Sequence, residues 1–271
     1  MRLELSTVFV AALAMGAFAI PTPTSPVPAA PSPSLCTPEQ LEQRGLDARA
    51  GVIHPSAKSP VTLFHGTSPE SAAGIVASGI NLSRGVPTGD FHHRPEVPGG
   101  FYLTDSVMVA AQFACYGSAK RPATVEILQY RWNPASFSVY EFPGETADWK
   151  NFQIYNSSPN LVVNENSPYR PLARTIYTNS MITGPLAGPA DVFITNAAWQ
   201  YAVVNQNAAN SLALQAQHPG ILCKNVPQGN RVDANLYAQG QAGNAKFNTR
   251  LAHLKDPNYS PGNGQFKCSI L

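Results

Sequence analysis

The chain has 271 residues, of which 44% are hydrophobic and only 13% are charged, and its formal net charge is +2. Such a small net charge offers no basic excess for binding nucleic acid, and no acidic bulk that would keep a long chain unfolded. The 25 prolines and 20 glycines favour a loop-rich globular protein of the kind found outside cells.

The first 19 residues predict a cleaved signal peptide. Arg2 supplies the positive charge, residues 8–14 are apolar, and Ala17 and Ala19 form a small-x-small cleavage site. The apolar run is shorter than the roughly 20 residues that span a bilayer. We therefore expect a secreted, extracellular protein without a membrane anchor.

Residues 20–35 hold six prolines among Ser, Thr and Ala, which predicts an extended linker. The folded part is expected to be one domain over residues 36–271. Its core should cover about residues 60–215, followed by a loop-rich C-terminal extension in which few apolar residues are available for burial.

The cysteines and the N-glycosylation sequons are typical of an exported protein. Four cysteines favour two disulfides, for which three pairings are open: Cys36, Cys115, Cys223 and Cys268. A zinc site is disfavoured because no two of these cysteines are closely spaced. Three N-glycosylation sequons, at Asn81, Asn156 and Asn258, predict a glycoprotein in a eukaryotic host.

The first predicted elements are clear. A β-prone run over residues 61–65 turns at Gly66-Thr67, and a helix follows from Ser68 as the N-cap to Gly79 as the stop. Residues 81–98 are predicted as a loop and residues 99–103 as a strand. A second helix should begin at Thr104 or Asp105 and run to Tyr116.

The later elements give an α+β pattern without regular βαβ alternation. Strands are expected over residues 124–132 and 136–142, adjacent in one sheet, and then a helix over 146–155. Further strands are predicted over residues 175–183, 191–195 and 199–204, and a helix over 207–217. Trp132, Trp149 and Trp199 are expected in the core.

Common catalytic signatures are missing from the sequence. It contains no G-x-G-x-x-G after a strand, no Walker loop, no H-E-x-x-H and no G-x-S-x-G. Asp90 with His92-His93 suggests a metal, but adjacent histidines in a loop do not converge on an ion, and a solvated loop is favoured. We expect no metal.

Four blocks, taken in order, resemble the ADP-ribosyltransferase superfamily. They are Phe64-His65-Gly66-Thr67, Gly99–Thr104, Gly184-Pro185-Leu186-Ala187, and Gln200 within Trp199-Gln200-Tyr201. The resemblance is to the branch of poly-ADP-ribose polymerases and diphtheria-like toxins, and within it to a small microbial and fungal family with a His-Tyr-Gln set. It covers about half of the chain.

The resemblance implies split antiparallel β-sheets with flanking helices, and NAD as the substrate. His65 would hydrogen-bond the adenosine ribose, and the Gly66 backbone would clamp the nicotinamide amide. Thr67 would line the NAD site, and Thr104 or Ser106 would add a hydroxyl contact. Tyr102 would stack on the nicotinamide ring, and Gln200 would hold the nicotinamide ribose. Tyr102 and Gln200 are the catalytic candidates, in mono-ADP-ribosyl transfer or NAD glycohydrolysis by a toxin or effector.

Two features depart from that family. Gln200 is a neutral amide where a carboxylate would oppose positive charge more strongly, and the acidic alternatives are Asp191 and Glu165. In addition, residues 90–98 separate Asp90-Phe91 from Gly99-Gly100, and this segment is a candidate lid.

Other functions remain open at this point. The chain could be a non-catalytic secreted binding module that keeps the fold, or a wall-associated structural protein suggested by the proline-rich segment. The partners expected are NAD and an unidentified protein or small-molecule acceptor, without nucleic acid or membrane, and the protein is expected to be a monomer.

Overall fold

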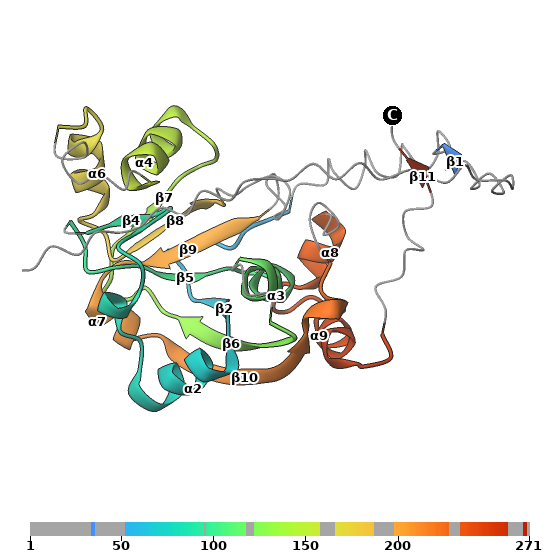
Figure 1. Ribbon diagram of the computed structural model, residues 1–271. Coiled ribbons are helices and arrows are strands. Elements are labelled where there is room, and N and C mark those ends of the chain that lie inside the picture. The colour runs from blue at the N-terminus through green and yellow to red at the C-terminus, as the bar shows by residue number, and fades with distance from the viewer. Residues whose placement is uncertain are drawn as a thin grey trace, which may run out of the picture.

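The computed structural model describes residues 34–35, 52–94, 96–117, 122–157, 166–186, 198–227, 234–259 and 268–269. The predicted α+β class is confirmed: within these residues lie two main, mostly antiparallel sheets and seven α-helices (Figure 1). The predicted signal peptide, residues 20–33 of the linker and the predicted strand 191–195 lie outside the described residues.

The first main sheet has three antiparallel strands in the order β10-β6-β2. They are β2 (Val61–Thr67), β6 (Thr124–Trp132) and β10 (Ala213–Leu222). The central strand β6 buries Val125, Ile127 and Trp132 completely, as expected for a strand with neighbours on both sides. The predicted strands 61–65 and 124–132 are thereby confirmed. The predicted turn at Gly66-Thr67 is wrong, because β2 continues to pair with β6 through Thr67.

The second main sheet has four strands in the order β5-β9-β8-β7. They are β5 (Phe101–Leu103), β9 (Trp199–Val203), β8 (Met181–Pro185) and β7 (Val139–Glu141). The prediction that segments 124–132 and 136–142 are adjacent is wrong. Both edges of β6 are already paired with β2 and β10, so β7 pairs in parallel with β8 instead.

Helix α2 (Pro69–Ser78) forms as its local signals predict. The Ser68 hydroxyl accepts from the Ser71 backbone N–H at 3.2 Å, and Pro69 occupies the first turn. The helix ends at Gly79, whose φ of 76° suits a residue without a Cβ.

Helix α3 (Val107–Tyr116) begins at Ser106 rather than at Thr104 or Asp105. Asp105 does not cap the helix because its carboxylate is bonded elsewhere. It accepts from Gln241 Nε2 at 2.6 Å and from the Tyr237 hydroxyl, and it pairs with His54 at 3.2 Å. The predicted end of the helix before Gly117 is confirmed.

The predicted helix over residues 207–217 is mostly wrong. Helix α7 (Gln206–Asn210) has five residues, and the chain then enters β10. Residues 213–222 fill the free edge of β6, so pairing in the folded state overrides the helix propensity of the Ala and Leu residues. Similarly, α6 (Arg170–Ile176) occupies the start of the predicted strand 175–183, and only its end is strand.

Three more helices cover the sheets. Helix α4 (Ala147–Ser157), predicted over 146–155, lies beside α6 over the four-stranded sheet (Figure 1). In the predicted loop-rich extension, α8 (Ala234–Gln239) and α9 (Phe247–Lys255) pack against the core: Tyr237 and Leu254 are buried, and Phe247 stacks on Phe64 at 5.6 Å. The extension is therefore more ordered than its polar composition predicts.

Short elements complete the described chain. They are η1 (Leu82–Arg84), β3 (Thr88–Gly89), β4 (His92–His93), η2 (Cys223–Asn225), and the pair β1 (Ser34–Leu35) and β11 (Cys268–Ser269). The predicted loop 81–98 thus contains a helical turn and a small ladder. Among the described helices, none is long and apolar enough to cross a membrane.

One disulfide, Cys115–Cys223, joins the end of α3 to η2. This bond belongs to one of the three possible pairings, the one in which Cys36 would join Cys268, and Cys36 lies outside the described residues. Of the sequons, Asn81 and Asn258 are exposed, whereas Asn156 is buried and bonds the Asp90 carbonyl and the Tyr177 hydroxyl. Glycosylation at Asn156 is incompatible with this folded structure.

Candidate functional site

The two main sheets meet at one bridge between β2 and the end of β5. Phe64 N–H donates to Thr104 O at 2.8 Å, and Thr104 N–H donates to Phe64 O at 3.0 Å. The next antiparallel step would join Gly66 to Tyr102. Instead, the Tyr102 carbonyl accepts from His65 Nδ1 at 2.8 Å. The imidazole thus replaces a backbone pair, and the two strands separate beyond it.

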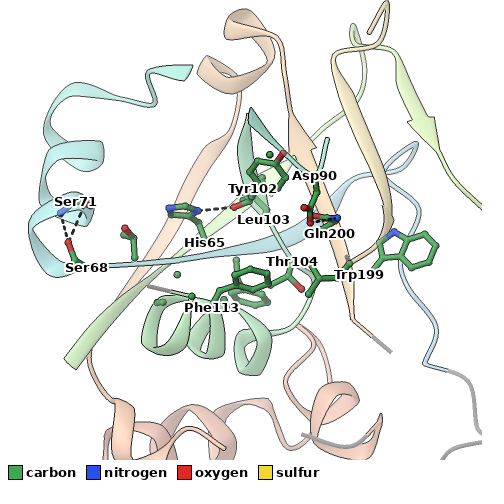
Figure 2. Close-up of a pocket in the computed structure, with 18 of the residues that line it drawn as sticks. His65, Ser68, Ser71, Asp90, Tyr102, Leu103, Thr104, Phe113, Trp199 and Gln200 are labelled. Atoms are coloured by element: carbon green, nitrogen blue, oxygen red, sulfur yellow. Dashed lines mark hydrogen bonds between the residues drawn. The ribbon is translucent and has the colours of Figure 1, made fainter. Parts of the chain in front are cut away.

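A cavity of about 700 Å³ opens at this separation. Six of the seven site residues predicted from the sequence line it: His65, Gly66, Thr67, Tyr102, Thr104 and Gln200. Figure 2 shows His65 near α2 and Gln200 beside Asp90, with Tyr102 between them. Residues from both sheets are therefore brought to one site.

Ser106 is the exception among the predicted site residues. Its side chain is fully buried outside the cavity lining, and its hydroxyl donates to the Tyr237 carbonyl at 2.9 Å. Ser106 secures the start of α3 to α8, and the prediction that it contacts a ligand is not supported by its position.

The hydrogen bond of His65 fixes its tautomer. A carbonyl oxygen only accepts, so Nδ1 carries the proton, and Nε2 of the neutral ring is an acceptor. Burial lowers the pKa of His65 and keeps the ring neutral near pH 7. Phe101 stacks on the ring at 4.3 Å and holds its orientation. His65 is therefore suited to accept a hydrogen bond from a hydroxyl group.

The Cα of Gly66 packs against α3, and its backbone N–H and C=O point toward the cavity. A Cβ at this position would lie 1.9 Å from the Ala110 carbonyl oxygen of α3, so only glycine fits. In an antiparallel strand, residues two apart direct N–H and C=O to the same side. Because Phe64 bonds Thr104 on that side, the N–H and C=O of Gly66 point away from β6, toward the cavity that Gly66 lines.

The Tyr102 ring is held by its hydroxyl group. His92 Nε2 donates to Val86 O at 2.9 Å, so His92 Nδ1 accepts from the Tyr102 hydroxyl at 2.8 Å. The same hydroxyl accepts from Phe91 N–H at 2.8 Å. Burial, and then the neighbouring Asp90 charge, raise the pKa of Tyr102 well above 10. Tyr102 is thus a rigid neutral aromatic residue, suited to stacking.

The described residues of the candidate lid segment 90–98 are packed into the fold, and only Asp90 among them lines the cavity. Phe91, His92 and His93 are buried, which contradicts the predicted solvated loop. Arg94 donates to the Pro98 carbonyl at 2.6 Å and to three carbonyls of residues 82–85. Within the described residues, no three His, Cys, Asp or Glu side chains form a group suited to a metal.

Gln200 and Asp90 are paired at the other end of the cavity. Gln200 is almost fully buried, and its Nε2 donates to Asp90 Oδ2 at 3.1 Å and to Pro185 O at 3.2 Å. Burial raises the pKa of Asp90 to about 6, although the Gln200 hydrogen bond acts in the opposite direction. The site therefore contains a carboxylate. The alternatives suggested from the sequence, Asp191 and Glu165, lie outside the described residues.

Three of the lining residues that were not predicted from the sequence bear on the chemistry of the site. Asp90 was considered only as part of a disfavoured metal site and of the candidate lid, although its place just before Phe91, in the pair separated from Gly99-Gly100, was a usable signal. Trp199, predicted as core, is half-buried and lines the cavity, and its ring stacks on His54 at 4.7 Å. Phe113 reaches the cavity from α3. Trp132 and Trp149 are buried as predicted.

Comparison with protein-family models and with curated protein sequences gives no match for this chain. The case for a function therefore rests on the residues and geometry of the cavity.

Proposed function

We propose that this protein is an exported ADP-ribosyltransferase-like enzyme that binds NAD⁺ and breaks its nicotinamide–ribose bond. The ADP-ribose would pass to a protein or small-molecule acceptor, or to water. One observation carries the proposal: His65, Tyr102 and Gln200, which lie on three strands of two sheets, line a single cavity.

The cavity has a suitable size and lining for this ligand. Its volume of about 700 Å³ lies within the range of pockets that enclose organic ligands. Aromatic residues contribute to its lining, with Tyr102 and Trp199 on either side of Gln200 and Phe113 on α3 (Figure 2). A dinucleotide has two flat ring systems joined by polar sugars and phosphates, and it needs such a mixture.

The backbone of Gly66 suits the nicotinamide group. A primary carboxamide has an N–H donor and a C=O acceptor side by side. The N–H and C=O of Gly66, both directed to the cavity, form the complementary pair. The Tyr102 ring would stack on the pyridine ring, a contact worth about 0.5–1.5 kcal/mol.

His65 and Gln200 would hold the two riboses. The neutral His65 Nε2 accepts a hydrogen bond from a sugar hydroxyl, and no described residue donates to Gln200 Oε1, which is likewise an acceptor. When the C1′–N bond breaks, nicotinamide leaves as a neutral molecule and positive charge develops on the ribose. Fixing both ends of the dinucleotide orients that bond and reduces the entropy lost on reaching the transition state.

The direct test is release of nicotinamide from NAD⁺ by the purified protein, followed chromatographically. The His65→Ala and Tyr102→Ala variants should each lose about 100-fold in rate, because each removes a positioning contact. His218→Ala and Tyr259→Ala are matched controls, since these side chains bond Gln129 and stack on His253 outside the cavity lining. The control variants should retain the parent rate.

The remaining outcomes separate the alternatives. Binding of NAD⁺ without nicotinamide release would favour the non-catalytic binding module. Neither binding nor release by the parent would overturn the proposal. Equal rates in the parent, His65→Ala and Tyr102→Ala would show that another site performs the reaction.

A further inference from the structure

Asp90 is the only described aspartate in the cavity lining, and Gln200 positions it. It follows β3, and its Oδ2 accepts from Gln200 Nε2 at 3.1 Å. Its backbone carbonyl accepts from Asn156 Nδ2 at 2.9 Å, and Asn156 is itself buried on α4. Asp90 is therefore held at both its main chain and its side chain.

The carboxylate has one oxygen free for a ligand. No described residue donates to Asp90 Oδ1, and no described Lys or Arg forms an ion pair with Asp90. A half-buried carboxylate without a cation is electrostatically unfavourable, and positive charge that develops on a bound substrate during the reaction relieves that penalty. The second acid of the cavity, Glu70, is fully exposed at the start of α2 and lacks this property.

We propose that Asp90 is the carboxylate of the active site and that Gln200 is its positioning residue. Asp90 would oppose the positive charge that develops on the ribose, and Gln200 would hold the carboxylate in place. The acid would thus come from the segment before β5 rather than from β9. This inference rests on the proposed cleavage of NAD⁺.

In the proposed reaction the C1′–N bond breaks, and its electron pair remains on the pyridine nitrogen of neutral nicotinamide. An oxygen lone pair of water, or of an acceptor hydroxyl, forms the new bond to C1′. The proton of that nucleophile passes to the Asp90 carboxylate and then to solvent. No oxidant or reductant is required.

The first experiment compares Asp90→Asn with the parent. Asparagine keeps the shape and still accepts from Gln200, but it carries no charge. We expect kcat for nicotinamide release to fall at least about 100-fold, with the Kd for NAD⁺ changed less than about threefold, since the charge acts mainly in the transition state. Asp148→Asn, which removes an exposed carboxylate from α4, is the matched control and should retain the parent rate.

The Gln200→Glu variant distinguishes the two possible roles of Gln200. If Asp90 is the acid, a second carboxylate at 3.1 Å forces the pair to share a proton, and the rate at pH 6–7 falls. If Gln200 itself faces the ribose charge, a carboxylate there raises the rate. A gain in turnover by Gln200→Glu would therefore overturn the assignment of Asp90.

The pH dependence of kcat distinguishes a catalytic role of Asp90 from a merely structural one, because loss of a structural contact would not remove a rise of kcat with pH. The parent kcat should rise as pH increases through about 6, as Asp90 ionises, and Asp90→Asn should lack this rise. The Asp90→Asn comparison separates this ionisation from those of the nearby groups. Burial lowers the pKa of His65 and of His92, and the pKa of Tyr102 lies well above 10, so a rise caused by a histidine would persist in Asp90→Asn.

The outcomes separate this inference from the proposed function. If the parent releases no nicotinamide, the proposed reaction fails, and the assignment of Asp90 fails with it. If the parent is active but Asp90→Asn retains more than a third of kcat and the same pH profile, only the assignment of Asp90 is overturned.

Discussion

At the scale of single residues, the N–H donors of the two polar side chains of the site are already bonded to other groups of the protein. His65 donates to Tyr102 O, and Gln200 donates to Asp90 and to Pro185 O. Each side chain therefore presents an acceptor to the cavity. Sugar hydroxyls are good donors, so this arrangement favours a ligand rich in hydroxyl groups.

Replacing Asp90 with Asn should stabilise the protein at neutral pH. The pKa of Asp90 is raised from 3.8 to about 6 in the folded state, so the folded protein holds this proton more tightly than the unfolded chain does. Parent stability should therefore fall, relative to the variant, as pH rises from about 4 to 6. Above pH 6 the variant should be more stable by about 2 to 3 kcal/mol.

Urea unfolding at pH 4 and pH 7.5 measures this difference. The two proteins should unfold at similar urea concentrations at pH 4 and diverge at pH 7.5. Equal stability at both pH values would show that burial does not destabilise the Asp90 carboxylate.

At the scale of elements, the cavity depends on how closely α3 approaches β2. The Ala110 carbonyl of α3 lies where a Cβ of residue 66 would be, and the same helix contributes Phe113 to the cavity. The distance between this helix and strand thus determines both packing and the width of the site.

The Gly66→Ala variant should therefore lose stability and ligand binding together. A methyl group 1.9 Å from a backbone oxygen forces α3 away from β2, and we expect a loss of about 3 kcal/mol. Gly74→Ala is the matched control, because a Cβ there meets nothing within 4 Å on exposed α2. It should gain up to about 1 kcal/mol. Thermal unfolding of both variants checks the contrast, and equal melting temperatures would contradict it.

The elements that sequence predicted well are those with local signals. Helix α2 has its cap, proline and glycine within twelve residues, and β6 has a continuous β-prone run. By contrast, β10 is a strand only because β6 offers it a free edge, and the position of β7 depends on its pairing with β8. Such pairings join segments that are distant in the sequence, and no local sequence pattern predicts them.

The same limit applies to prediction of the site. The order of the blocks in the sequence was enough to predict that His65, Tyr102 and Gln200 lie at one site, and all three line the cavity. The contact between Asp90 and Gln200 spans 110 residues and depends on how residues 86–94 pack, which the sequence does not encode locally. Ser106 was misassigned because its hydroxyl faces α8, which lies in the segment predicted as loop.

At the scale of the whole molecule, one crosslink joins distant parts of the chain. Cys115 and Cys223 are 108 residues apart, and both are buried. Near the bond, the Tyr116 hydroxyl contacts the carbonyls of Cys223 and Val226, and Cys223 N–H donates to Ala123 O. The disulfide therefore fixes the end of α3 against the end of the three-stranded sheet.

Removing this bond should strongly destabilise the fold. For a loop of about 108 residues, loop-closure entropy predicts a loss of roughly 4 to 5 kcal/mol in Cys115→Ser/Cys223→Ser. Urea unfolding measures the loss, with Cys36→Ser/Cys268→Ser as the comparison. Peptide mapping of the parent should recover Cys115–Cys223, and Cys36 joined to Cys268 remains a prediction. An unchanged midpoint in the first variant would contradict the expected contribution.

The position of this crosslink has a consequence for where the protein can work. Gly117 and Pro122, which flank the undescribed residues 118–121, line the cavity just beyond Cys115. In a compartment that keeps thiols reduced, this end of the binding site would lack its covalent anchor. Under the proposed function, cleavage of NAD⁺ should therefore depend on formation of the Cys115–Cys223 disulfide.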